Sequence, residues 1–431
     1  MARNAPTSLT VRTYDVGFGD CFLLSFAYAR GERHVLIDFG SMAWPKQKVV
    51  DGRTVERDYP NLIAKAIAAD CGGKLHAVVA THRHQDHVSG FARRAGRGPG
   101  EIIRALQPEL VIQPWTEDPQ AAVDATAPER RGFARSLLGM QQVAAQVHEA
   151  AKGLRGERLR GLREQLQAIG MDNIQNEDAV ANLGSMAPNR YLNHGSNAGL
   201  GRLLPGVRVT VLGPPTVEQS ASVRTQRARD DQEFWHLAEN FWQRLAVTAK
   251  ANTRDAPALF PRSATRRLPR SAGWYRYTAM KEQGDSLLSI VRMLDKAMNN
   301  TSLILLFEVG DTSILFPGDA QYENWMYTLS KPALVERLAR VNLYKVGHHG
   351  SLNATPKTLW NAFTRKGAAR TPGRLQTLLS TQQGVHGSTE RRTEVPRSSL
   401  LRALGEHSDL TNTQEFAPDE LRRAVTLPLV R

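Results

Sequence analysis

A cluster of three histidines and one aspartate follows a short apolar segment and restricts the folds open to this chain. Residues 76–80 predict a buried strand, and the next seven residues read Thr-His-Arg-His-Gln-Asp-His. Because side chains alternate along an extended chain, His82 and His84 should point to one side. Asp86 and His87 can reach a second point once the chain turns into a helix. This arrangement suits two neighbouring cations, and imidazole with carboxylate favours Zn, Mn or Fe over Ca or Mg.

Strand-like segments lie on both sides of this cluster. Apolar segments typical of strands occur at 9–14, 21–28, 34–38, 111–113, 207–212, 302–308, 313–316, 343–346 and 375–379. Two stretches, about 119–195 and 217–298, are instead polar and helix-like. Neither half of the chain has enough strands to close a sheet comfortably by itself. We therefore expect one domain over residues 1–431 that carries two helical insertions.

The composition narrows the class of protein further. A chain of 431 residues that is 41% hydrophobic can bury a sizeable core, which excludes a wholly disordered protein. No apolar run approaches the roughly 20 residues that a membrane helix needs, and residues 1–10 show no hydrophobic signal segment. Two cysteines, Cys21 and Cys71, are too few for a disulfide scaffold and fit a reducing compartment. We expect a cytoplasmic protein with no membrane partner.

The charge is strongly basic, with 56 Lys and Arg against 42 Asp and Glu, a net charge of +14. This balance favours a polyanion such as nucleic acid, although solvated arginines from a GC-rich genome are an alternative explanation. Residues 250–281 hold eight basic residues, one acidic residue and interleaved aromatics, which can bind nucleic acid or belong to a helical core. The candidate substrate contacts in this stretch are Arg266, Arg267, Arg270 and Trp274.

The histidine cluster resembles the metal-binding signature H-x-H-x-D-H of the metallo-β-lactamase superfamily. Other segments follow in that family's order: Asp38 after an apolar strand, Asp319 after a late strand, and then His348-His349-Gly350-Ser351. The resemblance is closest to the ComEC-like branch, which shows a Gly-x-Gly-Asp turn, an Asn-x-x-Ser segment and the sequence HHGS. This chain has these three at 17–20, 299–302 and 348–351. Matching elements cover most of residues 8–115 and 205–400.

The resemblance implies an α/β fold, a four-layer αββα sandwich, with a site for two divalent metal ions. His82 and His84 would hold metal one; Asp86, His87 and either His348 or His349 would hold metal two; Asp319 would bridge them, and Asp38 would orient a histidine. Many members have a third histidine for metal one after the strand that here ends at Gly213, and the ComEC-like branch often lacks it too. His194 is the nearest substitute; otherwise metal one would be weak, completed by water, or filled only when substrate binds.

Such a centre predicts a hydrolase. Two ions, Zn or Mn, would lower the pKa of a bridging water so that hydroxide forms near neutral pH and attacks a phosphorus or carbonyl centre. Asp86 and Asp319 would fix this hydroxide, and His349 or His386 would protonate the leaving group. The charge and the ComEC-like details favour a phosphodiesterase or nuclease. The alternatives are a hydrolase of a small ester, lactone or amide, and a non-catalytic binding module with a degenerate metal site.

Overall fold

The computed structural model describes residues 5–45, 48–50, 53–55, 58–118, 176–216, 299–351, 354–387 and 394–429. All of them belong to one compact unit, which draws on Met1–Asp118, Gln175–Gln219 and Met298–Arg431. This unit is mixed α/β, and its described ranges contain two large mixed sheets and eight α-helices. None of the helices in these ranges is long and apolar enough to cross a membrane.

The first sheet has seven strands in the order β15-β1-β2-β3-β6-β7-β8. They are β1 (Ser8–Tyr14), β2 (Cys21–Tyr28), β3 (Gly31–Phe39), β6 (Ala77–Val79), β7 (Val111–Pro114), β8 (Asn189–Leu192) and β15 (Arg422–Pro428). The strands from β15 to β3 pair antiparallel, whereas those from β3 to β8 pair in parallel. The carboxyl ends of β3 and β6 therefore lie at the same edge of the sheet.

The second sheet has six strands in the order β14-β13-β12-β11-β10-β9. They are β9 (Arg208–Gly213), β10 (Ile304–Val309), β11 (Thr312–Phe316), β12 (Leu343–Lys345), β13 (Gln376–Leu379) and β14 (Asp409–Asn412). β9, β10 and β11 pair antiparallel, and β11 to β14 pair in parallel. A separate antiparallel pair consists of β4 (Lys48–Val50) and β5 (Arg53–Val55).

The two sheets pack against each other through alternate side chains. Along β10, Leu305 and Phe307 join a core cluster that contains residues of both sheets, while Ile304 and Leu306 face the opposite way. Side chains of β3 alternate in the same way: Ile37 belongs to the cluster shared by the two sheets, and Leu36 belongs to a second cluster on the opposite face. Central strands are thus buried on both faces, which explains why their sequences are nearly continuous apolar runs.

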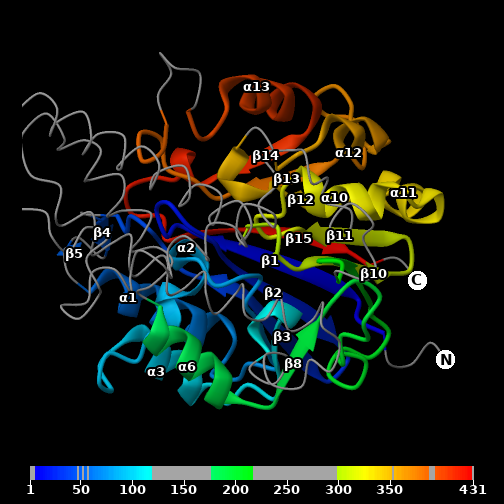
Figure 1. Cartoon of the computed structure of the whole chain (residues 1–431). Helices are drawn as coiled ribbons and strands as arrows, with labels where there is room; N and C mark the ends of the chain where they lie inside the picture. Colours follow the sequence, from blue (N-terminus) through cyan, green and yellow to red (C-terminus); the bar gives the residue numbers. More distant parts are fainter. Residues whose placement is uncertain are drawn as a thin grey trace, which may run out of the picture. The chain divides into compact units, whose positions relative to one another are not determined.

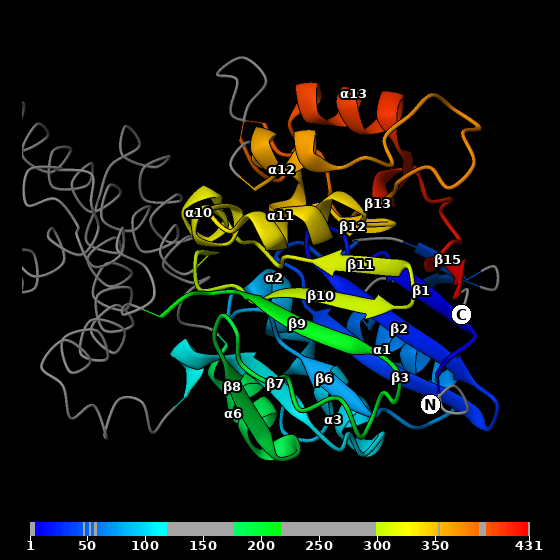
Figure 2. The same cartoon turned by 90° about the vertical axis from the view of Figure 1, so that its right-hand side faces the viewer.

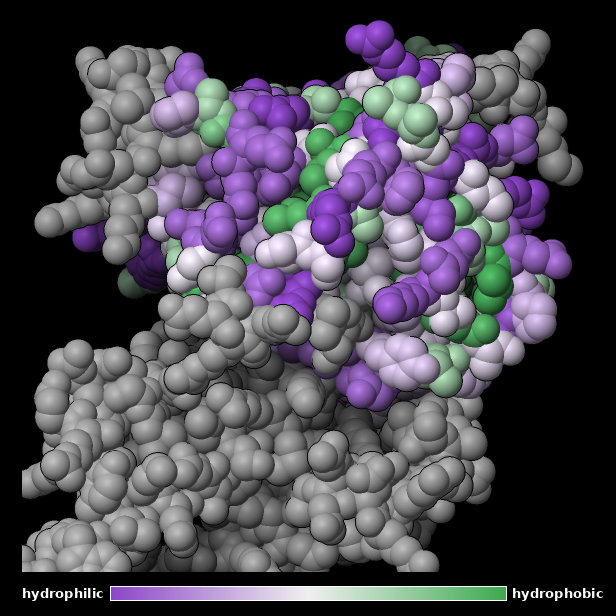
Figure 3. Space-filling model, turned by 90° about the horizontal axis from the view of Figure 1, so that it is seen from above, coloured by the Kyte–Doolittle hydropathy of each residue, from purple (hydrophilic) through white to green (hydrophobic). Residues whose placement is uncertain are grey.

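Helices cover the outer face of each sheet (Figures 1 and 2). Those near the first sheet are α1 (Tyr59–Asp70), α2 (Gln85–Val88), α3 (Pro99–Ala105) and α6 (Glu177–Met186). Those on the second sheet are α10 (Tyr322–Leu329), α11 (Pro332–Ala339), α12 (Lys357–Ala362) and α13 (Ser398–His407). They turn apolar residues inward, for example Ile63 of α1 and Leu404 of α13. The face in Figure 3 is correspondingly mostly hydrophilic.

The expected boundary of the first insertion, residue 195, is wrong. Residues 177–192 form α6 and β8: α6 buries Ala179 and Leu183 in the outer cluster, and β8 pairs in parallel with β7. The sequence does not predict β8, because only Leu192 among its four residues is buried and the strand therefore contains no apolar run. The rest of the two expected insertions, 119–175 and 217–298, lies outside the described residues.

Candidate metal centre

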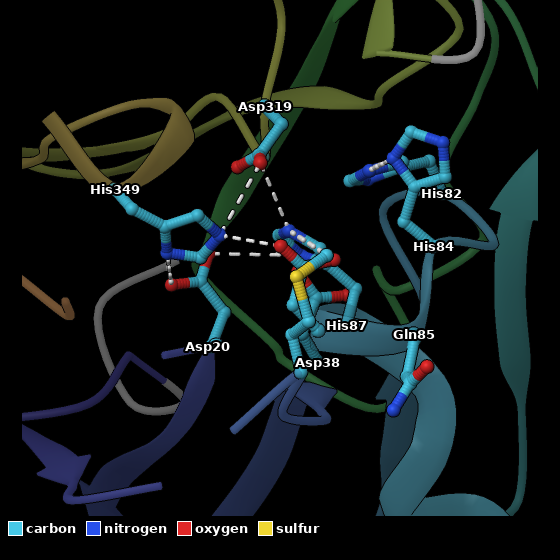
Figure 4. A network of polar contacts seen from close by, with 12 residues as sticks. Asp20, Asp38, His82, His84, Gln85, His87, Asp319 and His349 are labelled. Carbon is cyan, nitrogen blue, oxygen red and sulfur yellow. Dashed lines mark hydrogen bonds and ion pairs between the residues drawn. The ribbon is translucent and has the colours of Figure 1, made fainter. Parts of the chain in front are cut away.

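The candidate site lies where parallel strands of both sheets end. Asp38 is the next to last residue of β3, and Thr81 follows its parallel neighbour β6. In the second sheet, Asp319 follows β11, and His349 follows its parallel neighbour β12. Carboxyl ends of parallel strands meet at one edge of a sheet, where ligands commonly bind. Figure 4 shows the side chains from both sheets converging on one point.

Four of these side chains could hold one metal ion. One ligand atom each from Asp86, His87, Asp319 and His349 lies within 4.8 Å of all the others, and all four residues are buried. The Nε2 atoms of His87 and His349 lie 3.1 and 3.4 Å from Oδ2 of Asp319, and Nε2 of His349 lies 2.8 Å from Oδ2 of Asp86. Ligands about 2.0–2.2 Å from an ion are separated by at most about 4.4 Å, so the separations of 2.8, 3.1 and 3.4 Å are compatible with one shared ion.

The buried polar atoms of this cluster favour a bound cation. Asp86 Oδ1 is buried and forms no hydrogen bond within the described part of the chain, whereas the buried His87 Nε2 and Asp319 Oδ2 face each other as an ion pair of 3.1 Å. Burial lowers the pKa of His87, but the carboxylates of Asp319, Asp86 and Asp38 outweigh it and hold this pKa well above its usual value. Burial opposes charge on His349 too, yet Asp319 and Asp20 raise its pKa to about 10. The pocket thus favours positive charge, which a divalent ion can supply in place of protons.

The far nitrogens of both imidazoles are held by hydrogen bonds that aim Nε2 at the cluster. Nδ1 of His87 lies 2.8 Å from Oδ2 of Asp38, and Nδ1 of His349 lies 2.9 Å from the carbonyl oxygen of Ser380. Because both partners are acceptors, each Nδ1 carries the proton and donates it. Asp38 also accepts bonds of 2.7 Å from the backbone N and from Oγ1 of Thr81. Asp38 therefore lies where a residue that orients a metal-binding histidine should lie.

His82 and His84 form a second group beside the first. Their ring atoms Nε2 and Nδ1 lie 3.1 Å apart, and together with Asp86 they offer ligand atoms within 4.8 Å of one another. Asn299 lies next to them, with its Oδ1 3.1 Å from Nδ1 of His84. Burial, followed by the nearby His87 and His84, lowers the pKa of His82 well below its usual value. A neutral imidazole of this kind is a suitable metal ligand.

His194 does not join either group. Its Nδ1 donates to the carbonyl oxygen of Leu212 at 2.7 Å, its Nε2 lies 3.3 Å from Nζ of Lys331, and its ring packs edge-on against Tyr327. The proposed substitution of His194 for a third histidine is therefore wrong for this structure. A side chain at position 213 would clash with its neighbour, because a Cβ there would lie 2.4 Å from Oδ1 of Asn324.

The turn at residues 348–350 decides which of its two histidines faces the cluster. His348 and His349 both have left-handed backbone angles, φ 44° and 50°, which cost about 1–3 kcal/mol each and are found preferentially at functional sites. This turn buries His349 in the four-residue group. His348 lies at the margin, one quarter exposed, with Nε2 3.9 Å from Oδ2 of Asp319 and Nδ1 3.0 Å from Oγ of Ser351. The structure thus selects His349 from the two alternatives.

The remaining candidates lie outside the centre or outside the described residues. His386 is exposed, with Nε2 3.1 Å from Sδ of Met42, and its ring packs on Phe18, which in turn packs on His349. The candidate substrate contacts fall in the range that the structure does not describe: Arg266, Arg267, Arg270 and Trp274.

Two residues of the site were not assigned from the sequence, Asp20 and Lys345. Asp20 ends the Gly-x-Gly-Asp turn, which packs so closely that a Cβ on Gly19 would lie 2.2 Å from the carbonyl oxygen of Gly40. Lys345 ends the buried strand β12, and its Nζ forms an ion pair with Asp20. A lysine within an apolar strand is itself a signal, because lysine is almost never fully buried without a partner.

No protein-family model matches this sequence, and no curated protein matches it significantly. The residues of the site and their geometry are therefore the basis for its chemistry.

Proposed function

We propose that this protein is a metal-dependent hydrolase of the metallo-β-lactamase type that cleaves phosphodiester bonds. The observation that carries the proposal is the buried group Asp86, His87, Asp319 and His349, whose atoms face one another from the ends of strands in both sheets. The helices outside two packed sheets are compatible with a four-layer αββα sandwich. The ligands also occur in the chain order that this superfamily uses.

The candidate ligands would be shared between two metal ions, for which Zn and Mn are the candidates. His82 and His84 would hold one, and Asp86, His87 and His349 would hold the other. Asp319 would lie between them, with Oδ2 turned toward His87 and His349. When bound, such ions lower the pKa of water and stabilise negative charge on the oxygens of the reacting group.

The protein's own groups prepare this chemistry. Asp38 and Ser380 fix the proton of each imidazole on Nδ1, which leaves Nε2 as the electron-pair donor. The carboxylates of Asp86 and Asp319 offer oxygens that accept hydrogen bonds from an attacking water. Because the centre is almost fully buried, these charges act in a medium of low dielectric constant, where they are stronger than in water.

A phosphodiester in nucleic acid is the substrate that the charge favours. The net charge of +14 attracts polyanions, and half of it falls in residues 250–281. A small ester, lactone or amide would gain little from this charge.

The test combines metal analysis with turnover. Protein purified without chelator is analysed for bound transition metals and then assayed with Mn²⁺ or Zn²⁺ on DNA, RNA, bis-p-nitrophenyl phosphate and an ester. The variant His84→Ala/Asp86→Ala removes one imidazole and one carboxylate from the candidate ligands. His407→Ala, which replaces an exposed histidine on α13, is the matched control. We expect phosphodiester turnover in the wild type and in His407→Ala, and its loss in the double variant.

Three outcomes contradict the proposal in different ways. Nucleic acid turnover at the wild-type rate in the double variant would exclude this centre as the nuclease site. Hydrolysis of the ester alone, unaffected by competing DNA, would favour the small-substrate hydrolase. Protein that retains no transition metal would favour a binding module with a degenerate site.

A further inference from the structure

Lys345 is a fully buried cation that touches the candidate centre without being able to bind a metal ion. The residue is 1% exposed. Its Nζ donates to the carbonyl oxygen of Gly318 at 3.1 Å, lies 3.4 Å from Oδ1 of Asp319, and forms an ion pair with Oδ2 of Asp20. One of these partners, Asp319, belongs to the group of Asp86, His87, Asp319 and His349; Gly318 precedes it in the chain, and Asp20 lies 3.6 Å from Nδ1 of His87 and of His349.

These contacts fix the orientation of Asp319. Its Oδ1 is held by Nζ of Lys345 and by the backbone N–H of His348, 3.1 Å away. The other oxygen, Oδ2, is therefore turned toward the Nε2 atoms of His87 and His349. A carboxylate without these two donors would be free to rotate about its χ2 angle and present either oxygen.

The partner of the lysine, Asp20, lies behind the two imidazoles. Its Oδ2 is 3.6 Å from Nδ1 of His87, and its Oδ1 is 3.6 Å from Nδ1 of His349. These separations are too long for hydrogen bonds but favour the protonated Nδ1 on each ring electrostatically. The Lys345–Asp20 pair thus contacts or faces three of the four residues in the cluster.

Stability alone does not account for such a pair. Removing two charges from water costs several kcal/mol per ion, and replacing a buried ion pair by apolar residues of similar volume is often neutral or stabilising. An apolar residue at 345 would fit the rest of the buried strand β12. Since an apolar replacement of a buried ion pair is often neutral or stabilising, the contacts of this pair with three residues of the cluster are the better explanation for its presence.

We propose that Lys345, together with Asp20, is a positioning residue of the metal centre: it directs a single oxygen of Asp319 toward the ion and keeps His87 and His349 facing it. This inference rests on the proposed metal-dependent function. It concerns the affinity and geometry of the centre, whichever substrate is hydrolysed.

The test replaces both members of the pair, Lys345→Met/Asp20→Asn, which leaves the net charge of the centre unchanged. A change in metal binding then reports position rather than charge. The matched control is Arg374→Met/Asp409→Asn, which removes another pair with a buried cation, 2.8 Å long, that lies outside both ligand groups. The affinity for Mn²⁺ and Zn²⁺ is measured by calorimetry, the ligand field by the visible absorption of the Co²⁺-loaded protein, and folding by thermal unfolding in chelator.

We expect the Lys345/Asp20 variant to bind metal at least about tenfold more weakly, as loss of outer partners typically does, and to show shifted Co²⁺ bands. The Arg374/Asp409 control should keep wild-type affinity and bands even where it unfolds at a lower temperature. If the double variant does not fold, Asp20→Glu, which keeps both charges of the pair and moves the carboxylate by one CH₂ group, must still shift the Co²⁺ bands. Wild-type metal affinity and wild-type Co²⁺ bands in the Lys345/Asp20 variants would overturn the positioning role of Lys345. That result would leave the proposed hydrolase function unaffected. A wild-type protein that binds no metal would overturn both.

Discussion

At the scale of single residues, Asp38 shows how one carboxylate can prepare a metal ligand. Its two oxygens accept three hydrogen bonds, from the backbone N and Oγ1 of Thr81 and from Nδ1 of His87. Its backbone is left-handed, φ 54°, a conformation that Asp tolerates better than most residues. The loop after β6 and the candidate ligand His87 are thus tied to the end of β3 by one side chain.

We predict that Asp38→Asn lowers the affinity for Zn²⁺ or Mn²⁺ by about 10–100-fold. Asparagine has one acceptor oxygen instead of two, and its NH₂ group would face either Nδ1 of His87 or the donors of Thr81. The imidazole then loses the partner that keeps its proton on Nδ1. Calorimetric titration measures the affinity, and Asp311→Asn, in the exposed turn after β10, is the control. Equal affinities for Asp38→Asn and wild type would show that Asp38 does not orient His87.

The residues of the site differ in how far the sequence predicts them. His82, His84, Asp86 and His87 are close together in the sequence, and the structure also brings them together in space. The choice between His348 and His349 depends on two left-handed residues in one turn, which spacing does not encode. Lys345 belongs to the site only because β12 lies beside β11, and the sequence does not reveal that pairing.

At the scale of elements, apolar runs predict the central strands well because these strands are buried on both faces. The expected segments at 9–14, 21–28 and 313–316 correspond closely to β1, β2 and β11. The edge strands of the first sheet lack this signal: β15 alternates between exposed and half-buried residues, and β8 buries one residue of four. β15 also pairs with β1 from the other end of the described chain, a contact that no local pattern indicates.

A hydrogen-bonded histidine pair, His34 in β3 and His76 just before β6, makes the stability of the first sheet depend on pH. Nδ1 of His76 accepts a 3.0 Å hydrogen bond from the backbone N of His34, which requires this nitrogen to be unprotonated. Burial, helped by Arg33 and His34, lowers the pKa of His76 to about 4, and burial lowers that of His34. The unfolded chain binds protons near pH 6.5, so between pH 6.5 and 4 it holds more protons than the folded chain.

We therefore predict that the free energy of unfolding falls as the pH drops from 7 to 5, and that His76→Gln makes this fall smaller. Glutamine offers an acceptor oxygen for the same backbone N–H but takes up no proton. Urea unfolding at several pH values measures the effect, and His407→Gln, an exposed histidine on α13, is the control. Identical pH profiles for wild type and His76→Gln would contradict a buried neutral His76.

At the scale of the whole unit, the candidate ligands come from both sheets. Asp86 and His87 follow β6 of the first sheet, whereas Asp319 and His349 follow β11 and β12 of the second. These two sheets otherwise meet through the apolar cluster that contains Phe22 and Phe316. An ion held by all four residues would link the two sheets at one end of this interface, in addition to the apolar contacts.

This arrangement predicts that metal removal lowers the unfolding temperature of the unit as a whole. An ion that binds only the folded state adds about 2.7 kcal/mol when its free concentration is 100 times its Kd. Since the unfolding entropy is roughly 2.1 cal/mol/K per residue, about 1 kcal/mol shifts the unfolding temperature of a unit of this size by roughly 1.6 °C, so excess chelator should lower it by about 4 °C.

Scanning calorimetry with chelator and with added Zn²⁺ or Mn²⁺ measures this shift. The variant His87→Ala/His349→Ala lacks one candidate ligand after each sheet but keeps His82 and His84, so its unfolding temperature should respond to metal clearly less than that of the wild type. A shift of equal size in that variant would place the bound ion elsewhere in the protein. An unfolding temperature of the wild type that chelator leaves unchanged would mean that no ion links the sheets, since linkage requires any ligand of the folded state to stabilise it.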